Sequence, residues 1–123
     1  MFNFRLTCLE RLDIGQNEMT EVPEVIGSLT NIKELWMDAN RIKDLPDFLG
    51  NLERLVHLEV SLNHISRVTA AIGRCRALAD FSATTNNLKA LPETIGECVS
   101  LVTLKLDDNQ IEELPLSVGK VRD

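Results

Sequence analysis

Residues 32–54 read IKELWMDANRIKDLPDFLGNLER, and the pattern of these 23 residues recurs along the whole chain. An aliphatic residue fills the first position of each unit, asparagine the ninth and glycine the nineteenth. The first positions are Leu9, Ile32, Leu55, Leu78 and Leu101; the ninth are Asn17, Asn40, Asn63, Asn86 and Asn109; the nineteenth are Gly27, Gly50, Gly73, Gly96 and Gly119. A fixed period without insertions predicts a repeat protein whose units stack on their neighbours.

The repeat divides the chain into one partial and five complete units. We expect a partial preceding unit over residues 1–8 and complete units over 9–31, 32–54, 55–77, 78–100 and 101–123. Neither end shows the polar capping sequence that closes a solenoid. The chain is therefore expected to be part of a longer array or a short isoform.

Each unit predicts a short strand followed by an irregular segment. In the second unit Leu35 and Met37 alternate with polar neighbours, which predicts a strand with one face toward the core. Stacked strands of successive units would form a parallel sheet. Asn40 follows the strand, where its amide can bond backbone groups of the turn, so the repeated asparagines predict a buried ladder.

The second half of the unit predicts the opposite wall. Pro46 fixes its φ angle and donates no hydrogen bond, so this segment is expected to be irregular or a short helix rather than a strand. Gly50 and its equivalents are expected to adopt a backbone conformation that is strained for other residues. Seven positions are apolar in all five units, 35 residues in total, and predict the core; in the first unit they are Leu9, Leu12, Ile14, Met19, Val22, Ile26 and Leu29.

The unit resembles the leucine-rich repeat signature, Leu-x-x-Leu-x-Leu-x-x-Asn-x-Leu, as Ile32, Leu35, Met37, Asn40 and Ile42 show. The resemblance implies an α/β repeat solenoid of about five 23-residue repeats. Its parallel sheet would line the concave side of an arc, and irregular or 3-10 helical segments would form the convex side.

Composition limits the function. The 123 residues suffice for one domain, and the net charge of −6 disfavours nucleic acid or an anionic lipid surface as the main partner. Three cysteines do not make a secreted disulfide framework, so Cys75 and Cys98 are expected to face the core as free thiols. His57 and His64 lack further ligands at zinc spacing, and no transmembrane segment, cofactor, small-molecule substrate or catalytic group is predicted.

The outward residues of the strands form a candidate binding surface. We predict that partners bind there through Arg11, Asp13, Glu34, Trp36, Asp38, His57, Glu59, Asp80, Ser82, Lys105 and Asp107. The whole outward set holds seven acidic and two basic side chains, a net charge of −5. It adds the outward residues Gly15, Ser61, Thr84 and Thr103 and the rim residues Gln16, Ala39, Leu62, Thr85 and Asp108. One hypothesis is that this face accepts a basic protein surface; the alternative is an ordinary solvated strand face.

Trp36 is the only tryptophan and is expected to lie exposed in the middle of the sheet as an interface hot spot. The alternative is that its ring covers His57 and Asp13 by packing across strands.

Several units resemble one subgroup of these proteins, the LAP family of scaffolds with leucine-rich repeats and PDZ domains, which includes Scribble, Erbin and Densin. The matching stretches are 9–15 (LERLDIG), 34–40 (ELWMDAN) and 104–110 (LKLDDNQ), together with the third unit, where Thr69 replaces the proline. The resemblance implies a non-enzymatic scaffold in cell polarity, cytoplasmic and peripheral at the basolateral membrane or cell junctions. Small GTPases of the Ras or Rab type would be among its partners.

Two alternatives stay open from the sequence. A Ras-suppressor-like scaffold would share the repeat unit without PDZ domains. The chain could also be the targeting module of an enzyme.

Overall fold

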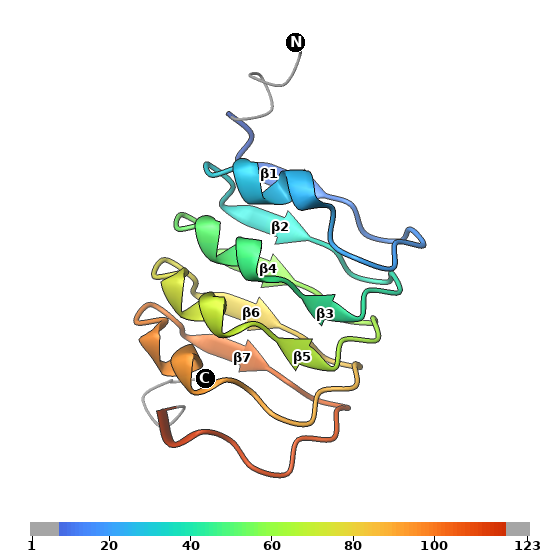
Figure 1. Ribbon diagram of the computed structural model, residues 1–123, viewed down its shortest axis with the longest axis vertical. Helices are drawn as coiled ribbons and strands as arrows, with labels where there is room; N and C mark the ends of the chain where they lie inside the picture. Colours follow the sequence, from blue (N-terminus) through green and yellow to red (C-terminus); the bar gives the residue numbers. More distant parts are fainter. Residues whose placement is uncertain (1–7, 118–123) are drawn as a thin grey trace.

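Five short parallel strands form one sheet along the length of the molecule (Figure 1). The computed structural model describes residues 8–117. The predictions for residues 1–7 of the partial first unit, for Gly119 and for the core positions Val118 and Val121 therefore lie outside the described residues. In sheet order the strands are β1 (Arg11–Asp13), β2 (Glu34–Trp36), β4 (His57–Glu59), β6 (Asp80–Ser82) and β7 (Thr103–Lys105). Their middle residues are aligned in register, from Leu12 through Leu35, Leu58 and Phe81 to Leu104.

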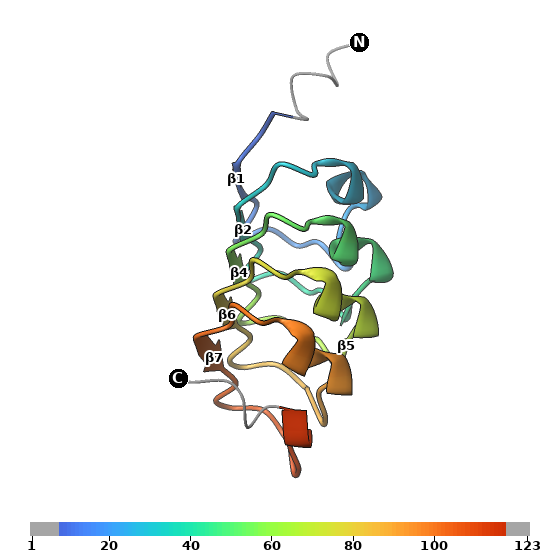
Figure 2. The same cartoon turned by 90° about the vertical axis from the view of Figure 1, so that its left-hand side faces the viewer.

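Within residues 8–117, four complete 3-10 helices form the opposite, convex side (Figure 2). They are η1 (Glu24–Ser28), η2 (Asp47–Asn51), η3 (Ala70–Arg74) and η4 (Glu93–Glu97), and β3 (Asp44–Leu45) pairs with β5 (Arg67–Val68) just before two of them. Proline precedes η1, η2 and η4, where its missing N–H and fixed φ suit the first turn. Residues 8–117 contain no α-helix. The predicted leucine-rich repeat arc, with its sheet on one side and 3-10 segments on the other, is confirmed.

In the third unit Thr69 stands at the position before the 3-10 helix where the other three helices have proline. Its Oγ1 accepts a hydrogen bond from the Ala71 N–H at 3.1 Å, which caps η3. The same hydroxyl donates to the Asp47 carboxylate of the preceding unit. The buried threonine therefore starts the 3-10 helix and joins two units.

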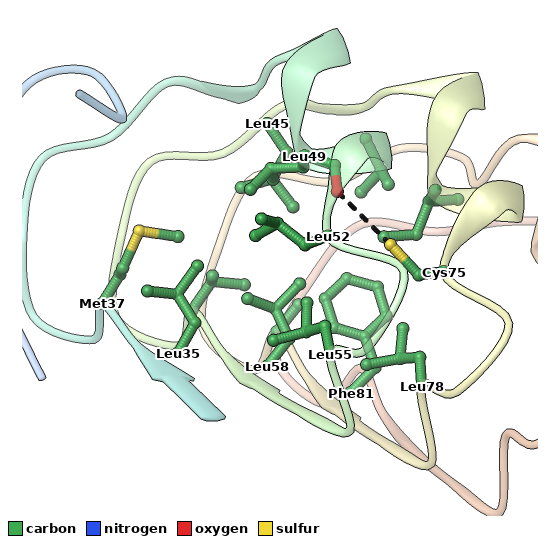
Figure 3. Packing of buried hydrophobic residues seen from close by; sticks show 14 of the residues in the cluster. Leu35, Met37, Leu45, Leu49, Leu52, Leu55, Leu58, Cys75, Leu78 and Phe81 are labelled. Carbon is green, nitrogen blue, oxygen red and sulfur yellow. Dashed lines mark hydrogen bonds between the residues drawn. The ribbon is translucent and has the colours of Figure 1, made fainter. Parts of the chain in front are cut away.

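The core is a continuous stack of aliphatic side chains between the sheet and the 3-10 helices (Figure 3). All 25 buried hydrophobic residues occupy the seven positions predicted from the repeat. Burial weakens at both ends, where Leu12 and Ile14 at one end and Leu104 at the other are only partly buried. Leu114 is 47% exposed, so the prediction that it faces the core is wrong, because the described residues provide a neighbouring unit on one side only.

The asparagine ladder is confirmed in the middle of the solenoid. The Asn40 amide group donates to the carbonyls of Met37 and Ile14, both at 3.1 Å, and its oxygen accepts from the Met19 N–H at 3.1 Å. Asn63 and Asn86 repeat this arrangement and are buried like Asn40. Asn17 is exposed and Asn109 only half-buried, so the ladder is solvent-shielded in three units of the five.

The repeated glycines do not adopt a left-handed backbone, so that prediction is wrong for the described residues. The left-handed position is the eighth of each unit, where φ lies between 56° and 59° and Gln16, Ala39, Leu62, Thr85 and Asp108 stand. The nineteenth position needs glycine because neighbouring 3-10 helices come close there. A Cβ at Gly50 would lie 2.8 Å from the Ala71 carbonyl oxygen and 2.9 Å from its Cβ.

We therefore expect Gly50→Ala to lower the free energy of unfolding by about 1–3 kcal/mol, because the added methyl group overpacks the contact between η2 and η3. Urea unfolding followed by circular dichroism measures the change. Ala39→Gly is the matched control, since it places glycine at a truly left-handed position and should leave stability unchanged or raise it. An unchanged stability of Gly50→Ala would contradict the packing explanation.

Candidate interaction surface

The structure places all eleven predicted site residues on one surface, which we call the concave face. Nine of them are the first and third residues of strands whose middle residue points into the core. Asp38 and Asp107 lie two residues beyond the ends of β2 and β7, on the same side because side chains alternate along an extended chain. That these residues bind a partner remains a prediction.

Trp36 lies at the centre of an aromatic cluster on the concave face. Its ring packs on His57 of β4 with centroids 4.4 Å apart and planes tilted by 30°. Arg11 is on β1, and its guanidinium carbon lies 5.6 Å from the centroid of the Trp36 ring. Trp36 is only partly exposed, so the prediction that it lies exposed is wrong, whereas its role as a hot spot stays a prediction. The packing across strands that was the alternative is present for His57.

Polar contacts hold this cluster in place. Glu34 accepts from the Trp36 Nε1–H at 3.3 Å and pairs with Arg11 Nε at 3.2 Å. On the other side His57 Nδ1 lies 3.9 Å from the Asp80 carboxylate. The contacts connect side chains of β1, β2, β4 and β6 into one preorganised patch, which reduces the ordering cost of binding.

The concave face keeps an excess of unneutralised carboxylates. Among the described residues, no cation pairs with Asp13, Asp38, Glu59 or Asp107. Arg11, one of the two basic residues on the face, is already paired with Glu34. The exposed acids therefore present a field that favours cationic groups of a partner.

A group of hydroxyls lies on the concave face in the third and fourth units. Ser61 Oγ lies 3.0 Å from Ser82 Oγ and accepts from the Thr84 hydroxyl at 2.9 Å and the Thr84 N–H at 3.1 Å. Ser61 is buried, so the prediction that it is an available outward residue is wrong. The hydroxyls of Ser82 and Thr84 contact Ser61, and the alternation of side chains along a strand does not predict such contacts.

Cys75 and Cys98 lie in the core as predicted, and both thiols are free. Their Sγ atoms donate to carbonyls of preceding units, Cys75 to Leu49 at 3.4 Å and Cys98 to Ile72 at 3.2 Å (Figure 3 shows the first). Burial in apolar surroundings is the main cause that raises the pKa of Cys75 to about 12 and that of Cys98 to about 11, from an ordinary value of 9.0.

These raised pKa values predict a loss of stability in alkaline solution. Below about pH 9 the thiols are protonated in both states, so their contribution is complete. Between pH 9 and the folded pKa values the unfolded chain loses protons that the folded chain keeps, and stability falls by about 1.4 kcal/mol per pH unit for each thiol. Urea unfolding between pH 8 and 10.5 measures this slope, and the chain has no tyrosine to add to it.

The matched control for the alkaline prediction is the double variant Cys75→Ala/Cys98→Ala, each protein being compared with its own stability at pH 8. The variant should show a flatter decline than the parent. Parallel declines would show that the thiols do not cause it.

The described residues show no sign of a metal centre or a membrane span. No three His, Cys, Asp or Glu side chains within residues 8–117 gather closely enough to hold a metal ion. No helix in the same range has the length and hydropathy to cross a bilayer.

The chain is similar to known proteins both in its repeat sequence and in its fold. Residues 9–51 match a family model described as leucine-rich repeats in two copies. A leucine-rich repeat protein of Leptospira interrogans superposes with a TM-score of 0.91 at 31% identity, over 96% of this chain and 30% of that chain. No curated protein sequence gives a significant match.

Two internalins of Listeria monocytogenes have the same fold. The internalin inlF superposes with a TM-score of 0.77 at 27% identity, over 95% of this chain and 35% of its own. Internalin C2 gives a TM-score of 0.83 at 21% identity, over 94% of this chain and 50% of its own. The chain therefore spans half or less of the length of the three solved structures.

Proposed function

Given a leucine-rich repeat solenoid, we propose that the chain is a non-enzymatic protein-interaction module that binds its partners on the concave face. The observation that carries the proposal is the preorganised cluster around Trp36. It lies beside Asp13, Asp38 and Glu59, whose carboxylates no cation of the described residues neutralises. Aromatic side chains held in place by neighbours supply contact area at low entropic cost, which is typical of interface hot spots. The acidic surroundings favour partners with a basic surface.

We further propose that this module serves a scaffold of the LAP type in cell polarity, at the basolateral membrane or cell junctions. The support is the resemblance of its units, in which ELWMDAN at residues 34–40 contributes both Trp36 and Asp38 to the concave face. Small GTPases of the Ras or Rab type are the partners that this resemblance favours.

Two charge reversals test binding on the concave face. The whole chain, Glu59→Arg and Glu24→Arg are immobilised and exposed to epithelial lysate, and the retained proteins are identified by mass spectrometry. Glu59 lies on the concave face and Glu24 is exposed on convex η1, so the substitutions change the charge equally on opposite sides. We expect Glu24→Arg to retain the partners of the parent and Glu59→Arg to lose them while keeping the parent's circular dichroism spectrum. Retention by both variants would contradict the proposal.

The polarity role is tested separately in polarised epithelial cells. A fluorescent fusion of the chain should concentrate along the basolateral membrane, and the Glu59→Arg fusion should be diffuse. A parent fusion spread evenly through the cell would contradict the LAP assignment and leave concave-face binding to the capture experiment.

A further inference from the structure

A pocket of about 430 Å³ opens on the concave face where β1 and β2 end. Its walls are Asp13, Gly15, Gln16, Trp36 and Asp38. Asp13 is the register partner of Trp36 across the sheet. Asp38 lies two residues beyond Trp36 on the same chain segment, so both carboxylates flank one indole ring.

The pocket exists because Gly15 has no side chain. Gly15 is the seventh residue of its unit, where the other units carry Asp38, Ser61, Thr84 and Asp107. A Cβ on Gly15 would lie 2.6 Å from Asp38 Oδ1, so even one methyl group would displace that carboxylate. The backbone of Gly15 is not left-handed, and the glycine is therefore not required by the turn.

The chemistry of the walls suits a cation. Asp13 Oδ1 accepts the Gly15 N–H at 3.0 Å, which fixes that carboxylate while its other oxygen stays available. No described residue forms an ion pair with Asp13 or Asp38. Arg11 lies over the Trp36 ring at 5.6 Å from its centroid and His57 packs on the ring at 4.4 Å, so the two carboxylates supply the attraction for a further cation.

We infer that this pocket receives an arginine side chain of the bound partner. The inference deepens the proposed function and rests on it. A guanidinium group is planar and carries five donors in a fixed fork, so it can bond the Asp13 and Asp38 carboxylates on two sides of the pocket at once. A lysine ammonium group offers one point charge and no planar fork, so it should bind the same pocket more weakly.

Trp36 is the only tryptophan of the chain and lines the pocket, so its fluorescence reports binding there. The whole chain is titrated with the peptide acetyl-Gly-Gly-Arg-Gly-Gly-amide, and the Trp36 fluorescence is recorded. We expect a saturable change, weakened by added salt. The same peptide with citrulline, an uncharged analogue of arginine, should give no saturable change. An equal response to both peptides, or no response to the arginine peptide, would overturn the inference.

Three substitutions distinguish binding inside the pocket from general attraction to the negative charge of the chain. Asp38→Asn removes one charged acceptor and should weaken arginine-peptide binding about tenfold. Gly15→Ala keeps both carboxylates and closes the space between them, so it should weaken binding at least severalfold. Glu24→Gln removes an equal charge from convex η1 and should leave binding unchanged within about twofold.

The inference would be overturned if Gly15→Ala bound the arginine peptide as tightly as the parent does. It would also be overturned if Glu24→Gln weakened binding as much as Asp38→Asn does. Circular dichroism confirms that each variant is folded, and Asp38→Asn keeps the test decisive if Gly15→Ala is not. Failure of the pocket differs from failure of concave-face binding, because the capture experiment depends on Glu59, which lies outside the pocket walls.

Discussion

Replacing Phe81 by alanine is expected to lower the free energy of unfolding by about 3–5 kcal/mol, the largest effect of any single substitution that we predict. Phe81 is completely buried and is the only aromatic residue among the 25 buried hydrophobic residues (Figure 3). The same unit carries the small Ala83 at its next inward position, just beyond β6, where other units have Ile14, Met37, Val60 and Leu106. In a close-packed core the neighbours relax only in part around a cavity of this size, so most of the lost packing is not recovered.

The change is measured by urea unfolding of Phe81→Ala at 25 °C, with Val99→Ala as the control. Val99 is 77% exposed, so its truncation should change stability by no more than about 0.5 kcal/mol. If Phe81→Ala lies in the range of that control, the core is not packed around Phe81 as described.

Asn63→Ala is expected to cost about 3 kcal/mol or more, because it leaves several buried backbone groups without partners. The Asn63 amide group donates to the carbonyls of Met37 and Val60, both at 3.0 Å. Its oxygen accepts from the Ile42 N–H at 3.0 Å. Each unsatisfied buried group costs about 1–3 kcal/mol. Met37 and Ile42 belong to the unit before that of Asn63, so the loss also weakens the stacking between the two units.

Asn17→Ala is the matched control for the ladder, since Asn17 is exposed and bonds only the carbonyls of Ile14 and Gly15. Water can take its place there, so we expect a loss below about 1 kcal/mol. The same urea titration measures both variants. Equal losses for Asn63→Ala and Asn17→Ala would show that burial of the ladder does not matter.

Most of the fold could be predicted from the sequence because the period of 23 residues links each position to one environment. The predicted core positions hold every buried hydrophobic residue, and the asparagines bond the turns as expected. The role of the glycines could not be predicted. Glycine is needed at position 50 because Ala71 of the next unit lies close to it, and residues so far apart in the sequence are brought together only by the fold. The predicted role, conformational freedom, is a property of the single residue.

The candidate surface was predicted at the level of its residues, not of their contacts. The strand alternation placed Trp36 and Asp38 on the concave face, but the packing of the Trp36 ring on His57 depends on the rotamers of both side chains. Gly15 received no role of its own from the sequence pattern. Its signal was visible, since the seventh position of every other unit has a side chain, but the resulting space becomes apparent only in three dimensions.

Amide-shift mapping by NMR tests most directly whether function lies on the concave face. An isotope-labelled sample of the whole chain is titrated with a partner that the capture experiment identifies. We predict that the largest shifts fall on residues 11–16, 34–39 and 57–59, with those of Gly15 and Trp36 among them. Shifts concentrated on η1 to η4, with the strands unaffected, would contradict the account and assign binding to the convex side.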